Sequence, residues 1–165
     1  MKNFTLILLM SLAILNANGQ TERDKKFVAC MALTGLLEIK ISELAEANGL
    51  AIEVKDIAKH MIDDHSKANN DLKLLADRKN ISFPTTLNEK QQKMYDKMAK
   101  LKGHDFDKHY IKCIAKGHKK MKCEMKKEVK KGADVDIEAW AQANLPTVQH
   151  HQDMTKAACK SIQKK

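Results

Sequence analysis

Apolar residues recur at alternating steps of three and four positions along most of the chain, with polar residues between them. This spacing is typical of amphipathic α-helices that bury one face. No stretch alternates apolar and polar residues as a half-buried β-strand does. Helix-breaking residues separate the periodic stretches. The pattern predicts helices over Asp24–Ala47, Ala51–Lys79, Leu87–Leu101 and Asp105–Lys131, and a further long helix from Asp134 or Asp136 to Ile162.

Four of these helices are long, and the one over Leu87–Leu101 is short. Long amphipathic helices with short connections form bundles, because each helix buries its apolar face against its neighbours. We therefore expect an all-α fold, a four-helix bundle with a short connecting helix between the second and third long helices. In a simple up-down order, the start of the first helix lies beside the end of the fourth. Pro146 is expected to kink the last helix.

The first residues have the pattern of an export signal. A basic residue precedes an apolar run over Phe4–Leu15, and the small residues Ala17 and Gly19 follow. This order is typical of a secretory signal peptide. A membrane anchor is the alternative, but the apolar run is shorter than the roughly 20 residues that span a bilayer. We expect residues 1–19 to be cleaved and residues 20–165 to form a single domain without a transmembrane segment. The protein is then exported to the periplasm or the outer membrane.

The chain is basic, with a formal net charge of +9 at pH 7. Lysines are densest between Lys116 and Lys131. A basic surface of this kind attracts anionic lipid, the phosphates of lipopolysaccharide or nucleic acid, although more often it is only a solvated helix face. The export signal and the scarcity of aromatic residues for base stacking argue against nucleic acid. Binding to anionic lipid or lipopolysaccharide remains an alternative function.

The chain has four cysteines, namely Cys30, Cys113, Cys123 and Cys159. An even number of cysteines in an oxidising compartment favours disulfides. No two of them are close enough to form a C-x-x-C motif. In the up-down order, Cys30 and Cys159 meet at one end of the bundle, and Cys113 lies at the same end. We therefore expect a Cys30–Cys159 disulfide, although four cysteines allow three complete pairings.

Each long helix carries one ionisable residue within its apolar stripe. At a rise of 1.5 Å per residue, all four residues fall near mid-helix and within about one turn of one another in the bundle. A buried carboxylate is costly unless it is paired or bound to a metal. Three imidazoles and one carboxylate suit Zn, Cu or Fe. The alternative is a hydrogen-bonded core network. The four residues are Glu38, His65, His118 and His151.

Other motifs, present or absent, narrow the choice of metal and of enzyme class. Met61, Met121 and Met154 each lie three or four residues from one of these histidines, and thioethers beside imidazoles favour copper. Methionine is also a common core filler. No E-x-x-H motif occurs, which argues against a di-iron carboxylate site. The H-E-x-x-H and G-x-S-x-G motifs of hydrolases are also absent. A binding protein is therefore more expected than an enzyme.

Four motifs occur in a fixed order, over Met61–Asn69, Phe106–Tyr110, Gly117–Lys120 and Asn144–His151. Together they resemble the bacterial family catalogued as domain of unknown function 4142, whose members are often described as exported or outer-membrane proteins. The resemblance covers about residues 26–158 and implies a ferritin-like helical bundle. It implies no activity, and the cysteines are not part of the family pattern. The pattern includes Met61, Asp64, His65, Asn69, Phe106, Asp107, Tyr110, His118, Leu145, Pro146 and His151, and Glu38 matches an acidic position of the first helix.

The leading interpretation is a binding or scaffold protein of the cell envelope with a metal site in the bundle core. The four residues of the apolar stripes are the expected ligands, and Asp64 and Asp107 are expected to orient them from outside. The first alternative is a metal-dependent redox enzyme with an open coordination position at the same residues. The second is the lysine-rich surface as a module for anionic lipid or lipopolysaccharide.

Overall fold

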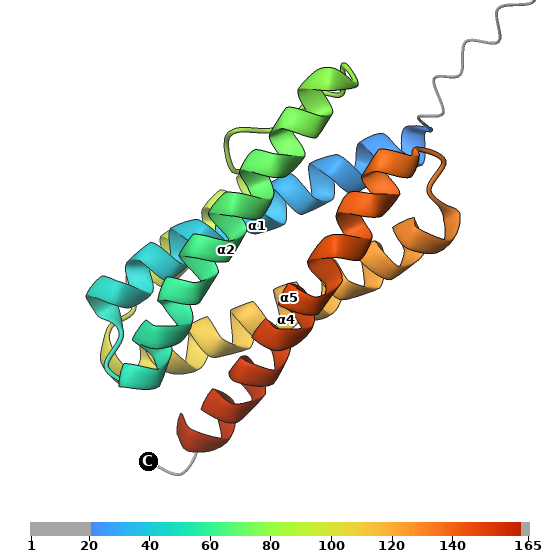
Figure 1. Cartoon of the computed structure of the whole chain (residues 1–165). Helices are drawn as coiled ribbons and strands as arrows, with labels where there is room; N and C mark the ends of the chain where they lie inside the picture. The colour runs from blue at the N-terminus through green and yellow to red at the C-terminus, as the bar shows by residue number, and fades with distance from the viewer. Residues whose placement is uncertain (1–20, 163–165) are drawn as a thin grey trace, which may run out of the picture.

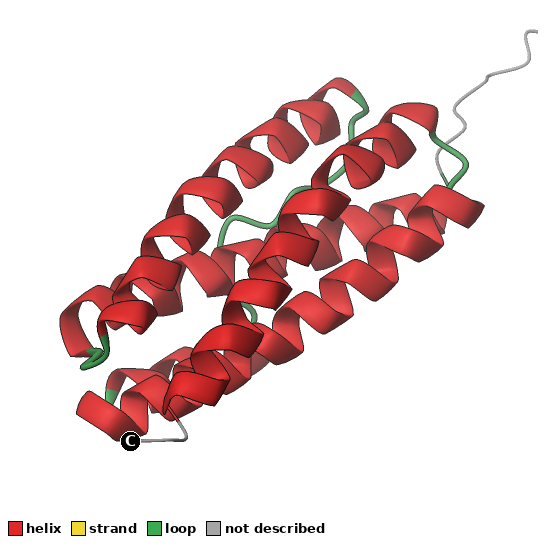
Figure 2. Cartoon of the chain, turned by 60° about the horizontal axis from the view of Figure 1, so that its bottom comes forward, coloured by secondary structure: helices red, strands yellow, loops and turns green. Residues whose placement is uncertain are grey.

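Residues 21–162 are described by the computed structural model of the protein, and the signal peptide predicted over residues 1–19 lies outside them. The described part is all-helical, as the apolar periodicity predicts, and it contains no strand (Figure 2). Its helices begin and end within two residues of the predicted bounds. They are α1 (Glu22–Asn48), α2 (Ile52–Arg78), α3 (Glu89–Ala99), α4 (Gly103–Lys131) and α5 (Val135–Ile162).

The four long helices pack against one another along a common core (Figure 1). The turns over 49–51 and 132–134 are short, so α1 is antiparallel to α2, and α4 is antiparallel to α5. The long segment 79–102, which includes α3, runs back along the bundle, so α4 begins at the same end as α2. Thus α2 and α4 are parallel, and so are α1 and α5. The short helix α3 contacts α1, where Gln91 Nε2 donates to Leu33 O at 2.7 Å.

This order of helix directions overturns the expected disulfide. Cys30, near the start of α1, packs against the apolar cluster around Phe27. Cys159, near the end of α5, packs against the apolar cluster around Ile41, at the opposite end of the bundle. The described cysteines form no disulfide. The Cys30–Cys159 prediction was wrong because the long connection makes α1 and α5 parallel, which separates the start of one from the end of the other.

Side-chain caps determine where helices begin. Thr21 Oγ1 accepts a hydrogen bond from the backbone N–H of Asp24 at 3.3 Å, and the Asp24 carboxylate accepts from Thr21 N at 2.6 Å. This capping box satisfies N–H groups that have no helical partner. At α5, Asp134 Oδ1 accepts from two backbone N–H groups at 3.0 and 3.2 Å, so Asp134 is the cap rather than Asp136.

The buried apolar side chains form two clusters, one toward each end of the bundle. One contains Ile41 and Ile114, and the other contains Met31 and Leu72. Between them, each long helix buries one ionisable side chain, so a polar layer divides the core. Buried polar groups destabilise a fold unless they have partners, so this layer requires interactions of its own. The four side chains and their exposed fractions are Glu38 at 2%, His65 at 3%, His118 at 0% and His151 at 0%.

The outer face of α4 is polar. Lys119, Lys120, Lys126 and Lys127 are exposed, whereas the opposite face of the same helix is buried. This division is the amphipathic pattern that the sequence predicts for the third long helix. Within residues 21–162, no helix combines the length and apolar character needed to cross a bilayer.

Candidate metal centre

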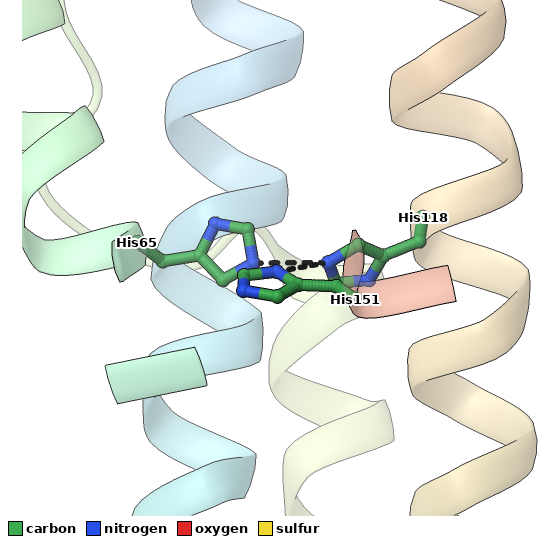
Figure 3. A group of neighbouring side chains, drawn as sticks. All are labelled: His65, His118 and His151. Atoms are coloured by element: carbon green, nitrogen blue, oxygen red, sulfur yellow. Dashed lines mark hydrogen bonds between the residues drawn. The ribbon is translucent and has the colours of Figure 1, made fainter. Parts of the chain in front are cut away.

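Three imidazole rings meet at mid-height in the bundle (Figure 3). His65 comes from α2, His118 from α4 and His151 from α5. His118 Nε2 lies 3.2 Å from His65 Nε2 and 3.0 Å from His151 Nδ1. One ligand nitrogen from each of the three rings lies within 4.8 Å of the others. Mid-helix positions on three helices thus direct three nitrogen atoms toward one point.

The outward nitrogens of two rings are held by hydrogen bonds. His118 Nδ1 donates to the backbone oxygen of Ile114 at 3.1 Å, and His151 Nε2 donates to Asp64 Oδ2 at 2.8 Å. Both acceptors are oxygens without a proton, so each of these nitrogens carries the hydrogen. The inward nitrogens, His118 Nε2 and His151 Nδ1, therefore present lone pairs when the rings are neutral. Metal-binding histidines are usually oriented by hydrogen bonds of this kind.

The fourth buried group, Glu38 of α1, lies beside the same rings. Its Oε2 is 2.9 Å from His65 Nε2, and its Oε1 is 3.3 Å from His118 Nδ1. These distances are short enough for ion pairs, although neither carboxylate oxygen has a well-formed hydrogen bond. A buried carboxylate without hydrogen bonds is unusual, because its desolvation costs several kcal/mol unless a cation lies close.

The electrostatics of the cluster favour a bound cation. Burial raises the pKa of Glu38, but the nearby His118 and His65 outweigh it and lower this pKa to about 2. Burial lowers the pKa of His118, and the Glu38 carboxylate more than reverses this, so the net shift is upward. Burial, with the two neighbouring imidazoles, lowers the pKa of His151 to about 4 against the opposing effect of Asp64. Without a metal, the cluster therefore holds the ionised Glu38 beside a neutral His151, and His118 binds a proton more readily than an ordinary histidine does.

The spacing of the inward nitrogens also fits a metal. A tetrahedral ion with bonds of about 2.0 Å to nitrogen separates its ligand atoms by about 3.3 Å. The observed separations at His118 Nε2 are 3.2 and 3.0 Å. His118 Nε2 carries at most one proton, so it donates to only one of its two nitrogen neighbours. One cation among the rings, whether a proton or a metal ion, therefore relieves the repulsion between their lone pairs.

The structure brings together all four residues that the apolar stripes singled out. Asp64 also lies where a ligand-orienting carboxylate was expected, because it accepts from His151. The same prediction for Asp107 was wrong. Asp107 accepts from the backbone N–H groups of Leu50 and Ala51 at 3.0 and 2.9 Å, and so caps the turn before α2. It precedes His118 by eleven residues on α4, a rise of about 16 Å.

Gly117 is a site residue to which the sequence analysis gave no role. A Cβ atom placed on Gly117 would lie 2.1 Å from Glu38 Oε1, so only glycine leaves room for the carboxylate in this position. Glycine inside a helix costs about 1 kcal/mol relative to alanine. A glycine directly before a buried histidine, in the middle of a long helix, was the signal available in the sequence.

Comparison with known proteins identifies the family. No curated protein and no solved structure matches the chain. The family model described as "Domain of unknown function (DUF4142)" matches residues 10–158, which is most of the chain. This range contains the four converging residues and the four motifs that suggested the resemblance. The chain therefore belongs to the DUF4142 family.

Proposed function

We propose that the protein is an exported protein of the cell envelope that binds one transition metal ion, Zn, Cu or Fe, in its core. The ligands would be His65 Nε2, His118 Nε2, His151 Nδ1 and the carboxylate of Glu38. One observation carries the proposal: three buried rings bring one nitrogen each to within 4.8 Å of the others, and the buried carboxylate of Glu38 lies 2.9 Å from one of them, His65 Nε2. The hydrogen bonds on the outer sides of two rings support it further, because they hold the tautomers that a metal requires.

Binding fits the donor set better than catalysis does. Four protein ligands fill a tetrahedral site, and closed sites of this kind are typically structural, whereas catalytic sites keep a position open. The set mixes imidazole and carboxylate donors, which all three candidate metals accept. Sulfur ligation is not required, since the donors already number four.

Metal content tests the proposal directly. The untagged mature protein would be purified from the periplasm and analysed for metals beside a His65→Ala/His118→Ala variant. The matched control is His60→Ala/His109→Ala, because both of these histidines are exposed. We expect about one equivalent in the parent and the control, and none in the core variant. Helical content, measured by circular dichroism, would confirm that the variants are folded.

If the purified parent protein contains no metal, the metal proposal is judged by whether the apo protein binds added metal ions. If the apo protein takes up neither zinc, copper nor iron during titration, the metal proposal is wrong. The polar layer would then be a structural network of a carboxylate and histidines. A metal content that is the same in the core variant and the parent would place the ion elsewhere and would also overturn the assignment.

A metal-dependent redox enzyme is the second candidate. A cavity of about 10 Å³ lies beside His65, and Asp64 and Asn144 are among its lining residues, most of which are apolar. It is large enough for about one water molecule, which favours a small fifth ligand over an organic substrate. Azide would test this candidate. A new charge-transfer band when azide is added to the copper-loaded protein would support an open position, and an unchanged spectrum would favour the closed binding site.

We also propose a ferritin-like architecture and export to the periplasm or outer membrane. The architecture is supported by two antiparallel helix pairs joined by one long connection that runs along the bundle. Export is supported by the basic, apolar and small-residue pattern of residues 1–19. Mass spectrometry of the protein isolated from cell envelopes would test it, with a mature N-terminus at Gln20 as the expected result.

A further inference from the structure

The positive charge of the chain is concentrated on α4. This helix contains ten lysines and four acidic residues, so it carries six of the nine net positive charges of the chain. From Lys108 to Lys131, nine lysines are exposed, and every exposed side chain that is charged at pH 7 is one of them. They extend over a rise of about 35 Å along the helix. These nine residues form the lysine face of α4.

The acidic residues of α4 do not neutralise the lysine face. Asp107 and Glu128 are buried on the opposite side of the helix, and Asp105 precedes the face. Glu124 pairs with Lys127 at 2.8 Å. Within residues 21–162, this is the one ion pair that the lysine face makes. Most of its ammonium groups are therefore available to an anionic partner.

The opposite side of the bundle has a different charge pattern. α2 lies diagonally across from α4, because both helices pack mainly against α1 and α5. It exposes as many aspartates as lysines and arginines. Lys67 pairs with Asp71 at 2.6 Å, and Lys73 pairs with Asp77 at 2.7 Å. Such mixed charges are sufficient to keep an outer helix face solvated, so solvation alone does not require the uniform charge of α4.

The lysine face offers charge without apolar anchors. Its surroundings on α4 include no exposed large apolar side chain, and the phenylalanine and tyrosine of α4 are buried. The face therefore has no side chain to insert into a bilayer and no phenol or phenyl ring to stack on nucleic-acid bases. The exposed large apolar side chains of the described residues all lie outside α4 and are Leu50, Ile52, Leu74, Met94 and Val135.

We propose that the lysine face of α4 docks on a membrane surface that contains anionic phospholipids, through ionic contacts with lipid phosphates and without insertion into the hydrocarbon. A bilayer presents its phosphates over a plane, so lysines along the whole helix meet them together, whereas a small soluble anion contacts only a few. The surface potential of the bilayer attracts lysines within about 10 Å at 0.1 M salt. This inference is independent of the metal site, and the proposed export only brings the protein to a membrane.

Co-sedimentation with lipid vesicles tests the docking surface. The mature protein would be mixed with vesicles of phosphatidylcholine, either alone or with about one third phosphatidylglycerol. Each lysine near an anionic bilayer strengthens binding about fivefold. The variant Lys112→Gln/Lys126→Gln/Lys130→Gln removes three exposed lysines of the face, all more than five residues from His118. We expect it to weaken binding to the anionic vesicles by at least about tenfold.

The matched control removes the same charge from the opposite side of the bundle. Lys59→Gln/Lys67→Gln/Lys73→Gln changes three exposed lysines of α2, and we expect binding to weaken less than about threefold. Equal weakening in the two variants would overturn the proposal, because net charge alone would then explain the binding. Circular dichroism would confirm that both variants are folded.

Salt and alternative anions complete the test. Parent binding to the anionic vesicles should be lost at about 1 M salt, where the Debye length falls to about 3 Å. Binding that persists at this salt concentration, or equal binding to phosphatidylcholine alone, would overturn docking by ionic contacts. A parent that binds lipopolysaccharide or duplex DNA but not the anionic vesicles would also overturn the proposal. Each of these results leaves the metal site untouched.

Discussion

Glu128, at the end of α4, allows a test of the bundle's electrostatics that is independent of any metal. Its side chain is 1% exposed and lies close to Asp24, while Arg23 Nε donates to its Oε2 at 3.3 Å. Burial, together with the Asp24 carboxylate, raises the pKa of Glu128 from 4.5 to about 7 despite the opposing Arg23. The N–H groups of Thr21 and Ala133 donate to Asp24 and lower its pKa, so the negative charge of Asp24 opposes the ionisation of Glu128.

The raised pKa makes folding stability fall as the pH rises. Below pH 4.5, Glu128 is protonated in both the folded and the unfolded state, so its contribution is fully present. Between pH 4.5 and 7, the unfolded chain loses the proton first, and the stability of the fold decreases. The full pKa difference corresponds to about 3 kcal/mol. We expect about half of it, since Arg23 is partly exposed and solvent screens the pair.

Glu128→Gln keeps the size and polarity of the side chain and removes its titration. We expect the variant to match the parent within about 0.5 kcal/mol at pH 5 and to be more stable by about 1–2 kcal/mol at pH 8. Urea unfolding of the apo protein, followed by circular dichroism at intervals between these values, measures the difference. Glu124→Gln is the control, because Glu124 pairs with Lys127 in the solvated face of the same helix. A difference between Glu128→Gln and the parent that does not change with pH would refute the reasoning.

Three further substitutions test other parts of the structure. Gly117→Ala should reduce metal affinity at least tenfold in a competition with a chelator, because the new Cβ displaces the carboxylate of Glu38; an unchanged affinity would remove Glu38 from the ligand set. Asp107→Ala should destabilise the apo protein by about 1–2 kcal/mol in urea, since it leaves two partly buried backbone N–H groups without their acceptor. Tyr110→Phe should cost about 1–2 kcal/mol in the same assay, because it removes the buried 2.8 Å hydrogen bond with Ser42. Parent-like stability of either of these two variants would contradict the hydrogen bonds described here.

The sequence predicts the helices and the mid-bundle cluster for the same reason. Apolar periodicity identifies the buried face of each helix, and an ionisable residue on that face has to point into the core. His118 lies near the middle of α4, and a mid-helix residue remains at mid-height whichever way its helix runs. The convergence of Glu38 and the three histidines therefore did not depend on helix directions.

Residues near helix ends did depend on those directions. Cys30 and Cys159 lie at the same end of the bundle if α1 and α5 are antiparallel, and at opposite ends if they are parallel. The course of segment 79–102 determines which of the two arrangements forms. The apolar pattern of that segment does not predict whether it turns back at one end of the bundle or runs along its length. The role of Asp107 also was not predictable, because its partners are backbone N–H groups of a distant turn, which periodicity does not reveal.

The helix order described above has a consequence for assembly. α1 with α2 and α4 with α5 are two helical hairpins, and each supplies half of the donor set: Glu38 and His65 from the first, His118 and His151 from the second. The centre therefore lies on the seam between two halves of the chain, and neither half contains it alone. An ion bound there would stabilise the association of the two hairpins. The free energy of association would gain about 4 kcal/mol when the ion concentration is a thousand times the dissociation constant. Two separately expressed hairpins should then associate more tightly with metal than without it.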